Sequence, residues 1–307
     1  MTNNYSEQTP AGWLAFELSV LRRLSFRTAV SPACAEPDVE AYLKRWGVRV
    51  SVNAVARWAW VRAVARVENN LERLTREDLE LLLEDVYVPG HRLRNDALAR
   101  RFGEAHAWWF DNFRANADRL ANDTKRALAL DLGLMVGDYA LSFDDETREL
   151  RQPLSRALLR LAEARPAPFD NRQRNAVKQE DAQRFLADSR AADLLFLRLP
   201  AARASATDAA HAWRDEFIEG GADSAPAPEG TRTGRPVATR QQYLSDLEEL
   251  LAAAGRARVW AVSHVDNGHL PAEELVEVLR RHRKVETVYT KDFSELAGAR
   301  AVMITAG

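Results

Sequence analysis

Residues 26–52 read FRTAVSPACAEPDVEAYLKRWGVRVSV, and this stretch decides the fold class. The apolar run at 26–30 has the residue types of a buried strand, and the two prolines after it mark a loop. A helix is expected over 39–46, ending at Gly47, and 48–52 is a second β-rich run. Strand, loop, helix and strand in this order form a βαβ unit, which predicts a parallel sheet with a right-handed crossover.

The same alternation returns in the second half of the chain. Apolar runs predict further strands at 175–177, 193–197, 258–263, 285–290 and 301–305. Helical spacing of apolar residues predicts helices at 13–24, 154–163, 182–187, 243–254 and 273–282. Between the two halves, 57–126 reads as helix after helix. The apolar segment 128–141 contains two glycines and fits either a helix or a buried strand.

This pattern predicts an α/β chain in three parts. Residues 1–65 form the first part of the sheet domain, 66–168 a mostly helical insertion, and 169–307 the second part of the sheet domain. Within the last part, residues 219–239 are rich in Gly, Pro, Ala and Ser and are expected to be a flexible loop. No internal repeat is present.

Composition excludes several classes of protein. The 307 residues carry a formal net charge of -2, with 46% hydrophobic and 29% charged residues, which is ordinary for a globular protein. No apolar run approaches the roughly 18 residues of a membrane span, and the polar start is not a signal peptide. The single cysteine, Cys34, excludes an intramolecular disulfide and a Cys-rich zinc site. The cytoplasm is therefore the expected location.

Common catalytic motifs are missing from the sequence. The six histidines are scattered, and the densest titratable cluster is His264, Asp266 and His269, for which a solvated turn is the simplest interpretation. There is no P-loop and no Gly-x-Gly-x-x-Gly, and Ser263 lacks the glycines of a nucleophile elbow. The loop after the first strand has alanines and Pro37 where glycines would admit a phosphate, so it is a poor nucleotide loop.

Basic and aromatic residues offer candidates for nucleic-acid contact. The expected contact residues lie in two clusters, Arg172 with Arg174, and Arg232 with Arg235 and Arg240. The second cluster has few acids nearby and is the better candidate. Trp58 and Trp60 cannot share one helix face, so at least one of them is expected to be exposed or to lie at an interface.

Three stretches together resemble the DNA adenine-N6 methyltransferases of the DNA adenine methylase class. They are 31–54, with its loop, helix and strand ending in Asn53; 175–201, with Asp181-Ala182 before the strand into Leu199-Pro200; and 259–305, with the closing strands and helix. The likeness covers residues 26 to 305 and rests on segment order more than on any intact motif. It implies a Rossmann-like S-adenosylmethionine-methyltransferase fold with a mostly parallel sheet and a helical, target-recognition-like insertion subdomain.

The positions that hold the cofactor in this family are altered here. The resemblance places Ala33, Ala35 and Pro37 at the aromatic and the two glycines of the cofactor loop. Ala54 stands where the family has the acid that binds the cofactor ribose. Only Asp181 matches, at the acid beside the cofactor adenine. No bound cofactor is expected.

The catalytic motif of the family is altered as well. Arg198, Leu199, Pro200 and Ala201 stand where the family has Asp-Pro-Pro-Tyr, which holds and stacks a flipped adenine. An arginine can only donate hydrogen bonds and would repel the sulfonium of the cofactor, and Ala201 has no ring. Loss of one transition-state contact of this kind costs roughly 2–4 kcal/mol.

The resemblance therefore predicts a catalytically degenerate methyltransferase-like protein that binds DNA or a protein partner, with no membrane and no metal. A role in restriction-modification or phage defence is implied by the resemblance only. The alternatives are an active adenine-specific methyltransferase with divergent motifs, and a Rossmann-like protein-interaction module.

Overall fold

A seven-stranded sheet forms the centre of one half of the molecule. The computed structural model describes residues 12–88, 90, 92–144, 146–199, 206–220, 239–265, 270–293 and 299–307. The strands in it are β1 (Thr28–Cys34), β2 (Arg49–Ala54), β3 (Ala176–Lys178), β4 (Leu194–Arg198), β5 (Val259–Val265), β6 (Val285–Phe293) and β7 (Ala299–Ala306). Their order across the sheet is β3-β2-β1-β4-β5-β7-β6. Strands β1 to β5 pair in parallel, and β7 runs antiparallel to both of its neighbours.

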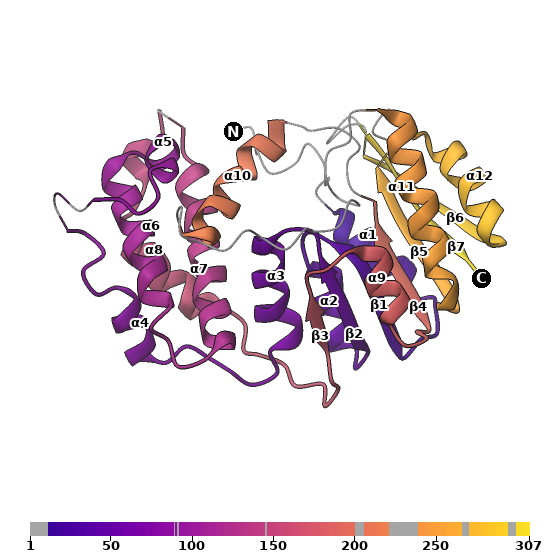
Figure 1. Cartoon of the computed structure of the whole chain (residues 1–307), viewed down its shortest axis with the longest axis horizontal. Coiled ribbons are helices and arrows are strands. Elements are labelled where there is room, and N and C mark those ends of the chain that lie inside the picture. Colours follow the sequence, from indigo (N-terminus) through magenta and orange to yellow (C-terminus); the bar gives the residue numbers. More distant parts are fainter. Residues whose placement is uncertain are drawn as a thin grey trace.

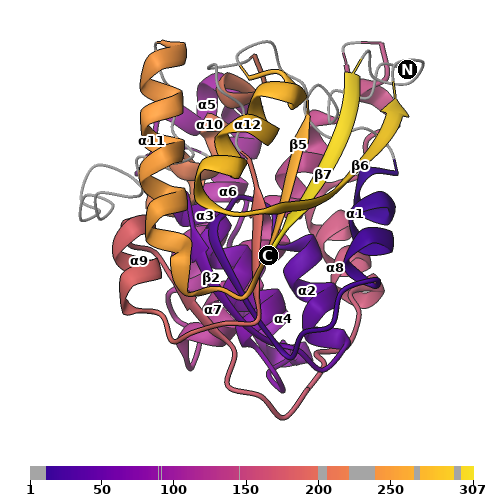
Figure 2. The same ribbon diagram turned by 90° about the vertical axis from the view of Figure 1, so that its right-hand side faces the viewer.

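Helices cover both faces of this sheet. One face packs against α1 (Trp13–Leu21) and α2 (Asp38–Arg45), and the other against α9 (Ala182–Asp188), α11 (Arg240–Ala253) and α12 (Ala272–His282). Figure 2 views these two layers edge on. Since a parallel sheet is apolar on both faces, each helix layer buries one of them. A short turn of 3-10 helix, η3 (Ala254–Arg256), leads into β5.

A helical lobe lies beside the sheet, next to the β3 edge (Figure 1). We define it as residues 57–164 together with 206–219. It contains α3 (Arg57–Ala63), the π-helical turn η1 (Val64–Glu68), α4 (Arg76–Leu82), α5 (Ala97–Phe102), α6 (Glu104–Ala117), α7 (Asp123–Leu141), the 3-10 turn η2 (Arg148–Leu150), α8 (Leu154–Ala164) and α10 (Ala206–Glu219). These elements share one large apolar core, separate from the two cores on the sheet faces.

Helix α10 follows β4 in the chain but packs in the helical lobe. Trp213 and Phe217 lie directly on Gly137 and Gly133 of α7, where an added Cβ would come within 2.1 Å and 2.6 Å of the two rings. The glycines are four residues apart and so share one face of α7. Their role is to let two large rings approach the helix backbone, which explains why an apolar segment with two glycines is helical.

The coarse fold prediction is confirmed, because the chain is α/β with a mostly parallel sheet and helices on both faces. The βαβ unit at 26–52 is present, with β1 and β2 parallel around α2. The open choice at 128–141 is settled as helix α7. Helix α10 is not predicted by the sequence pattern. The expected loop at 219–239 lies almost wholly outside the described residues.

Candidate functional site

The carboxyl ends of β1, β4 and β5 meet at a buried group of polar side chains. We call this the strand-end cluster; it consists of Glu17, Ser31, Cys34, Glu40, Arg198 and Ser263. Arg198 is the last residue of β4 and lies beside Ser263 in the sheet register. Its Nε and Nη2 donate to the two carboxylate oxygens of Glu17 at 3.0 and 2.6 Å. Because Glu17 comes from α1, this ion pair holds the first helix to the end of the central strand.

Glu17 is held by more than one hydrogen-bond donor. Its side chain has no solvent exposure, and besides Arg198 it accepts a hydrogen bond of 2.6 Å from Ser263 Oγ. Burial alone would lower the pKa of Arg198, but the Glu17 carboxylate raises it above its ordinary value. A two-point contact between guanidinium and carboxylate is the strongest form of such a pair. Arg198 is therefore a fixed cation committed to an internal partner.

A second carboxylate and the only cysteine complete the strand-end cluster. Glu40 of α2 accepts a 2.7 Å hydrogen bond from Ser31 Oγ, and its burial raises its pKa despite the nearby Arg198. Burial also raises the pKa of the Cys34 thiol well above its ordinary value, and Glu40 adds to this. A thiol held protonated is a poor nucleophile. The Cys34 thiol is therefore not activated for nucleophilic attack.

The catalytic positions expected from the family lie at this strand end only in part. Leu199 is buried in the core on the α9 and α11 side, whereas Arg198 reaches Glu17 on the α1 side. Pro200 and Ala201 lie outside the described residues. Asp193 lies at the opposite, amino end of β4, where its carboxylate accepts hydrogen bonds from the N–H groups of Arg27 and Thr28.

The loop after β1, where the family binds its cofactor, is closed by ion pairs. Strand β1 continues to Cys34 because its pairing with β2 continues that far, so Ala33 lies in the strand and not in the loop that the sequence predicts after residue 30. Ala33 and Pro37 are buried, and Ala35 is exposed. Between them, Glu36 pairs with Arg62 at 2.5 Å and with Arg214 at 3.1 Å. These arginines come from α3 and α10, so the loop is bound to the helical lobe. Its one carboxylate is already neutralised by two guanidinium groups.

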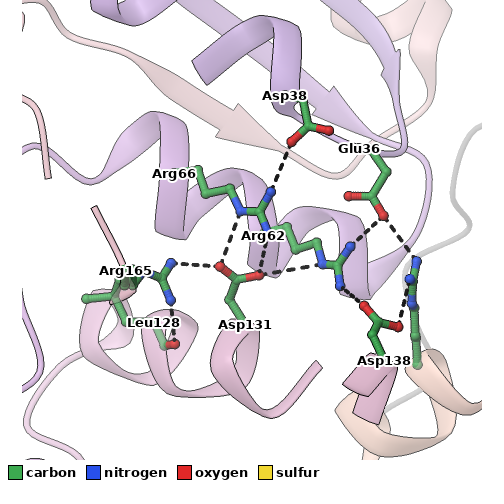
Figure 3. Close-up of polar contacts among 9 residues, drawn as sticks. Glu36, Asp38, Arg62, Arg66, Leu128, Asp131, Asp138 and Arg165 are labelled. Carbon is green, nitrogen blue, oxygen red and sulfur yellow. Dashed lines mark hydrogen bonds and ion pairs between the residues drawn. The ribbon is translucent and has the colours of Figure 1, made fainter. Parts of the chain in front are cut away.

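Glu36 belongs to a larger ion-pair network between the sheet and the helical lobe. The network consists of Glu36, Asp38, Arg62, Arg66, Asp131, Asp138, Arg165 and Arg214, and Figure 3 shows how most of these side chains converge. At its centre, Asp131 contacts Arg165 at 2.7 Å, Arg66 at 3.3 Å and Arg62 at 3.5 Å.

Four guanidinium groups face four carboxylates in the ion-pair network, so it is neutral as a whole. Burial alone would raise the pKa of Asp131, but Arg66, Arg165 and Arg62 together hold it below its ordinary value. Trp58 adds a further contact, since the guanidinium groups of Arg214 and Arg62 lie 4.7 and 5.5 Å from its ring. The network fixes the lobe to the sheet and leaves little charge for a ligand.

Sequence reasoning missed this network and Glu17. One signal was present, because Asp131 stands inside the apolar segment 128–141, where a lone carboxylate needs a partner. Arg62 and Arg66 are also four residues apart and so share one helix face. The partners themselves come from distant segments, so the sequence does not identify them.

The other positions that the resemblance assigns to the cofactor have structural roles, as does their neighbour Asn53. Ala54 is fully buried beside Cys34 in the sheet. Asp181 caps α9 by accepting hydrogen bonds from the N–H groups of Gln183 and Arg184. Asn53 is fully buried, and its amide joins two loops by donating to Pro32 O and Glu180 O and accepting from Glu180 N, at 2.9 to 3.0 Å.

One open cleft lies at the same edge of the sheet, beyond β3. It has a volume of about 460 Å³ and is lined by Arg57, Trp60, Val177, Lys178, Gln179 and Glu180. Two of these residues come from the start of α3 and four from the end of β3 and the loop after it. Trp58 and Trp60 have separated as their spacing predicts, with Trp58 buried and Trp60 partly exposed in the cleft.

The predicted nucleic-acid residues are not gathered in one place. Arg172 and Arg174 are exposed before the start of β3, at the amino edge of the sheet. Arg240 begins α11 and pairs with Glu274 at the start of α12, and these helices begin at the carboxyl edge. Arg232 and Arg235 lie outside the described residues. The structure thus places two of the three described arginines on the edge opposite Arg198.

The predicted histidine cluster can be described only in part. His264 is buried, and its Nε2 lies 2.7 Å from Leu270 O, which differs from a solvated turn. Asp266 and His269 lie outside the described residues. Within the described ranges, no group of three or more His, Cys, Asp or Glu side chains is placed to hold a metal ion. In the same ranges, no helix combines the length and the apolar character needed to cross a membrane.

Comparison with known proteins adds no family to this description: no family profile matches the sequence, and no curated protein is detectably similar to it.

Proposed function

We propose that this protein is a catalytically degenerate relative of the DNA adenine-N6 methyltransferases, which keeps the fold and binds DNA or a protein partner without transferring a methyl group. The strand order supports the relationship, because an antiparallel β7 between β5 and β6 is typical of S-adenosylmethionine-dependent methyltransferases. The main segment of the helical lobe, residues 57–164 between β2 and β3, stands where the proposed family carries its target-recognition insertion.

The bidentate pair between Arg198 and Glu17 carries the proposal. Methyl transfer to an adenine amino group needs a hydrogen-bond acceptor at the end of β4 that binds the N6 hydrogens. The chain has a guanidinium there, which has no acceptor atom and whose charge would oppose an approaching sulfonium. The pair also turns the side chain inward to α1.

The residues at the cofactor positions do not fit S-adenosylmethionine. The loop after β1 lacks the glycines that allow close approach, and Glu36 in it is held by Arg62 and Arg214. Ala54, at the ribose-binding position, is buried and has no polar group. Both observations support a chain that does not depend on the cofactor.

The retained activity that fits the fold is binding to DNA through the helical lobe and the Arg232–Arg240 region. One observation favours a protein partner as the second candidate. Within the described ranges, most of the exposed large apolar side chains lie in or beside the helical lobe, namely Leu71, Tyr87, Val88, Leu150, Leu159 and Phe169. Exposed apolar groups favour protein contacts, and the net charge of -2 gives no general attraction to DNA.

The test combines a calorimetric titration with S-adenosylmethionine and a methyl-transfer assay on duplex DNA. We expect no heat at millimolar cofactor and no label in the DNA. Binding to duplex DNA should weaken steeply as salt rises, because phosphate contacts release counterions. Micromolar cofactor binding or labelled DNA would overturn the proposal. A complex that co-purifies with the protein, together with no DNA binding, would select the protein-partner form.

A further inference from the structure

The cleft beyond β3 has polar groups that the rest of the fold does not use. The side chains of Arg57 and Gln179 and the indole N–H of Trp60 make no hydrogen bond or ion pair with any residue of the described ranges, although the Trp60 ring packs against the core of the helical lobe. All three are partly buried. By contrast, Trp58 lies against two guanidinium groups. The cleft thus brings an aromatic ring, a guanidinium and an amide together, and their polar groups have no partner among the described residues.

Among the lining side chains there are two cations and one anion. Lys178 pairs with Glu180 at 2.9 Å, and Arg57 has no ion-pair partner among the described residues, so its guanidinium is the charge that a ligand can engage. The edge of the sheet is not available for strand addition at this point. The N–H of Val177 donates to Glu68 Oε2 at 2.8 Å, so the middle residue of β3 is already paired. A ligand of the cleft is therefore recognised by side chains.

We propose that this cleft binds a nucleotide, with the base against Trp60 and the phosphate on Arg57 and Lys178. A guanidinium matches phosphate oxygens with two parallel hydrogen bonds, and a tryptophan ring stacks on any base. The Gln179 amide can both donate to and accept from a base edge. The volume of about 460 Å³ suits one nucleotide.

The inference goes beyond the proposed function and does not rest on it, since a nucleotide at this cleft is independent of whether methyl transfer is lost. The cleft lies at the end of β3, whereas the substrate base in the adenine methyltransferases is held at the end of β4. The position that the resemblance places beside the cofactor adenine, Asp181, follows the cleft residues in the chain, but its carboxylate caps α9 and does not line the cleft. The two cations also disfavour a sulfonium ligand here. Two kinds of ligand carry the base and the phosphate that the cleft would bind. One is a free nucleoside monophosphate, and the other is one nucleotide of a single-stranded nucleic acid.

The test uses the full chain and calorimetric titration with dAMP, adenosine, inorganic phosphate and a short single-stranded oligonucleotide. We expect dAMP to bind about tenfold or more tightly than adenosine or phosphate alone, because only dAMP engages both the ring and the cations. Arg57→Gln should weaken dAMP about tenfold, and Trp60→Leu about as much. Arg57→Lys should keep part of the affinity.

The matched control is Arg76→Gln, since the Arg76 side chain is 87% exposed in α4 and contacts only Glu80. It should leave dAMP binding unchanged. If the circular dichroism spectrum shows that Trp60→Leu is not folded, dAMP binding is measured with Trp60→Phe and Arg57→Gln instead. Tighter binding of the oligonucleotide than of dAMP, lost in Arg57→Gln, would identify a strand as the source, and equal binding would identify the free nucleotide.

Three results would overturn the inference. The first is that neither dAMP nor the oligonucleotide binds at millimolar concentration. The second is that adenosine or phosphate binds as tightly as dAMP. The third is that Arg57→Gln and Arg76→Gln reduce binding equally, which would indicate a general charge effect. A phosphotyrosine peptide that binds more tightly than dAMP, with the same loss in Arg57→Gln, would likewise replace the nucleotide by a protein ligand.

Discussion

Arg198 and Arg57 lie at the same edge of the sheet but in opposite surroundings. Arg198, at the end of β4, is bound at two points by a carboxylate that has no solvent exposure. Arg57, beside the end of β3, faces an open cleft without a carboxylate partner among the described residues. Arg198 is committed to a partner inside the fold, whereas Arg57 is available to a ligand. The surroundings of each arginine therefore decide which of the two sites can bind a ligand.

The difference extends beyond the two arginines. Around β1 and β4, the strand-end cluster and the ion-pair network neutralise nearly every charge internally. Around β3, Lys178 pairs with Glu180, and the Arg57 guanidinium has no ion-pair partner among the described residues. We therefore expect that removing a charge from the strand-end cluster or the ion-pair network lowers stability, and that removing the charge of Arg57 affects only ligand binding. Four variants test this, from the largest expected effect to the smallest.

The largest effect is expected for Arg198→Met. It leaves the Glu17 carboxylate buried with only Ser263 as partner, and an uncompensated buried charge costs about 3–5 kcal/mol. Urea unfolding at pH 7 measures this loss. The double variant Glu17→Met with Arg198→Met should recover most of it, because an apolar pair of similar volume avoids the buried charge. If the double variant is no more stable than the single one, the pair is not the cause.

The second variant, Asp131→Asn, breaks the centre of the ion-pair network. We expect a loss of about 2–3 kcal/mol at pH 7, below the full cost of a broken buried pair because Arg62 keeps Glu36 and Asp138, and Arg66 keeps Asp38. The pKa of Asp131 is held below its ordinary value in the fold, so its contribution is complete above an unfolded pKa of about 3.9. It is lost as the pH falls through the lower folded pKa.

Unfolding at a series of pH values checks this dependence. The stability difference between the wild type and Asp131→Asn should be constant from pH 5 to 7 and shrink as the pH falls below about 4. A difference that stays constant down to acid pH would show that lost packing, and not lost charge, accounts for the effect.

A smaller effect of opposite sign is expected for Asp215→Asn. Burial, with Glu219 nearby, raises the pKa of Asp215 to about 6, although the N–H of Trp58 donates to it. Because the folded pKa is above the unfolded one, this group favours the fold below about pH 4, and that advantage disappears as the pH rises through about 6. Asparagine keeps an acceptor for Trp58 and has no charge to bury.

Asp215→Asn should therefore be about 1 kcal/mol more stable than the wild type at pH 8, after allowance for solvent screening, and nearly equal to it at pH 4. Thermal unfolding at the two pH values measures the difference. A loss of stability at pH 8 would show that the charged carboxylate is needed at the start of α3.

The smallest effect is expected for Arg57→Gln, which should change stability by less than about 0.5 kcal/mol because no described contact is removed. Urea unfolding in the absence of nucleotide measures it beside Arg198→Met. A loss of stability close to that of Arg198→Met would contradict the contrast, because Arg57 would then matter to the fold as much as Arg198.

The sheet and its covering helices were predictable because their signals are local. Runs such as 193–197 and 258–263 are apolar and bounded by polar residues, and they form β4 and β5 within two residues of the expected bounds. Helical spacing of apolar residues likewise places α2 and α12, although neither helix has a capping side chain, because Pro37 and Pro271 stand at the N-cap positions. These patterns depend on neighbouring residues only.

The site was less predictable because its contacts join distant segments. The sequence draws attention to residue 198, but its partner Glu17 is 181 residues away, and Arg214 is 178 residues from Glu36. Helix α10 was missed for a related reason, since its two large rings take their places from Gly133 and Gly137 on another helix. The cleft unites α3 with a strand more than a hundred residues later.

The placement of α10 makes the helical lobe discontinuous in the chain. Its aromatic core needs Trp213 and Phe217, which follow four strands of the sheet, two before and two after the main helical segment. During synthesis, the lobe is complete only after β1, β2, β3 and β4 have already emerged. A fragment cut at 57–164 would expose two glycines and the surface that the rings cover. The helical lobe and the sheet are therefore expected to fold together, as one cooperative folding unit.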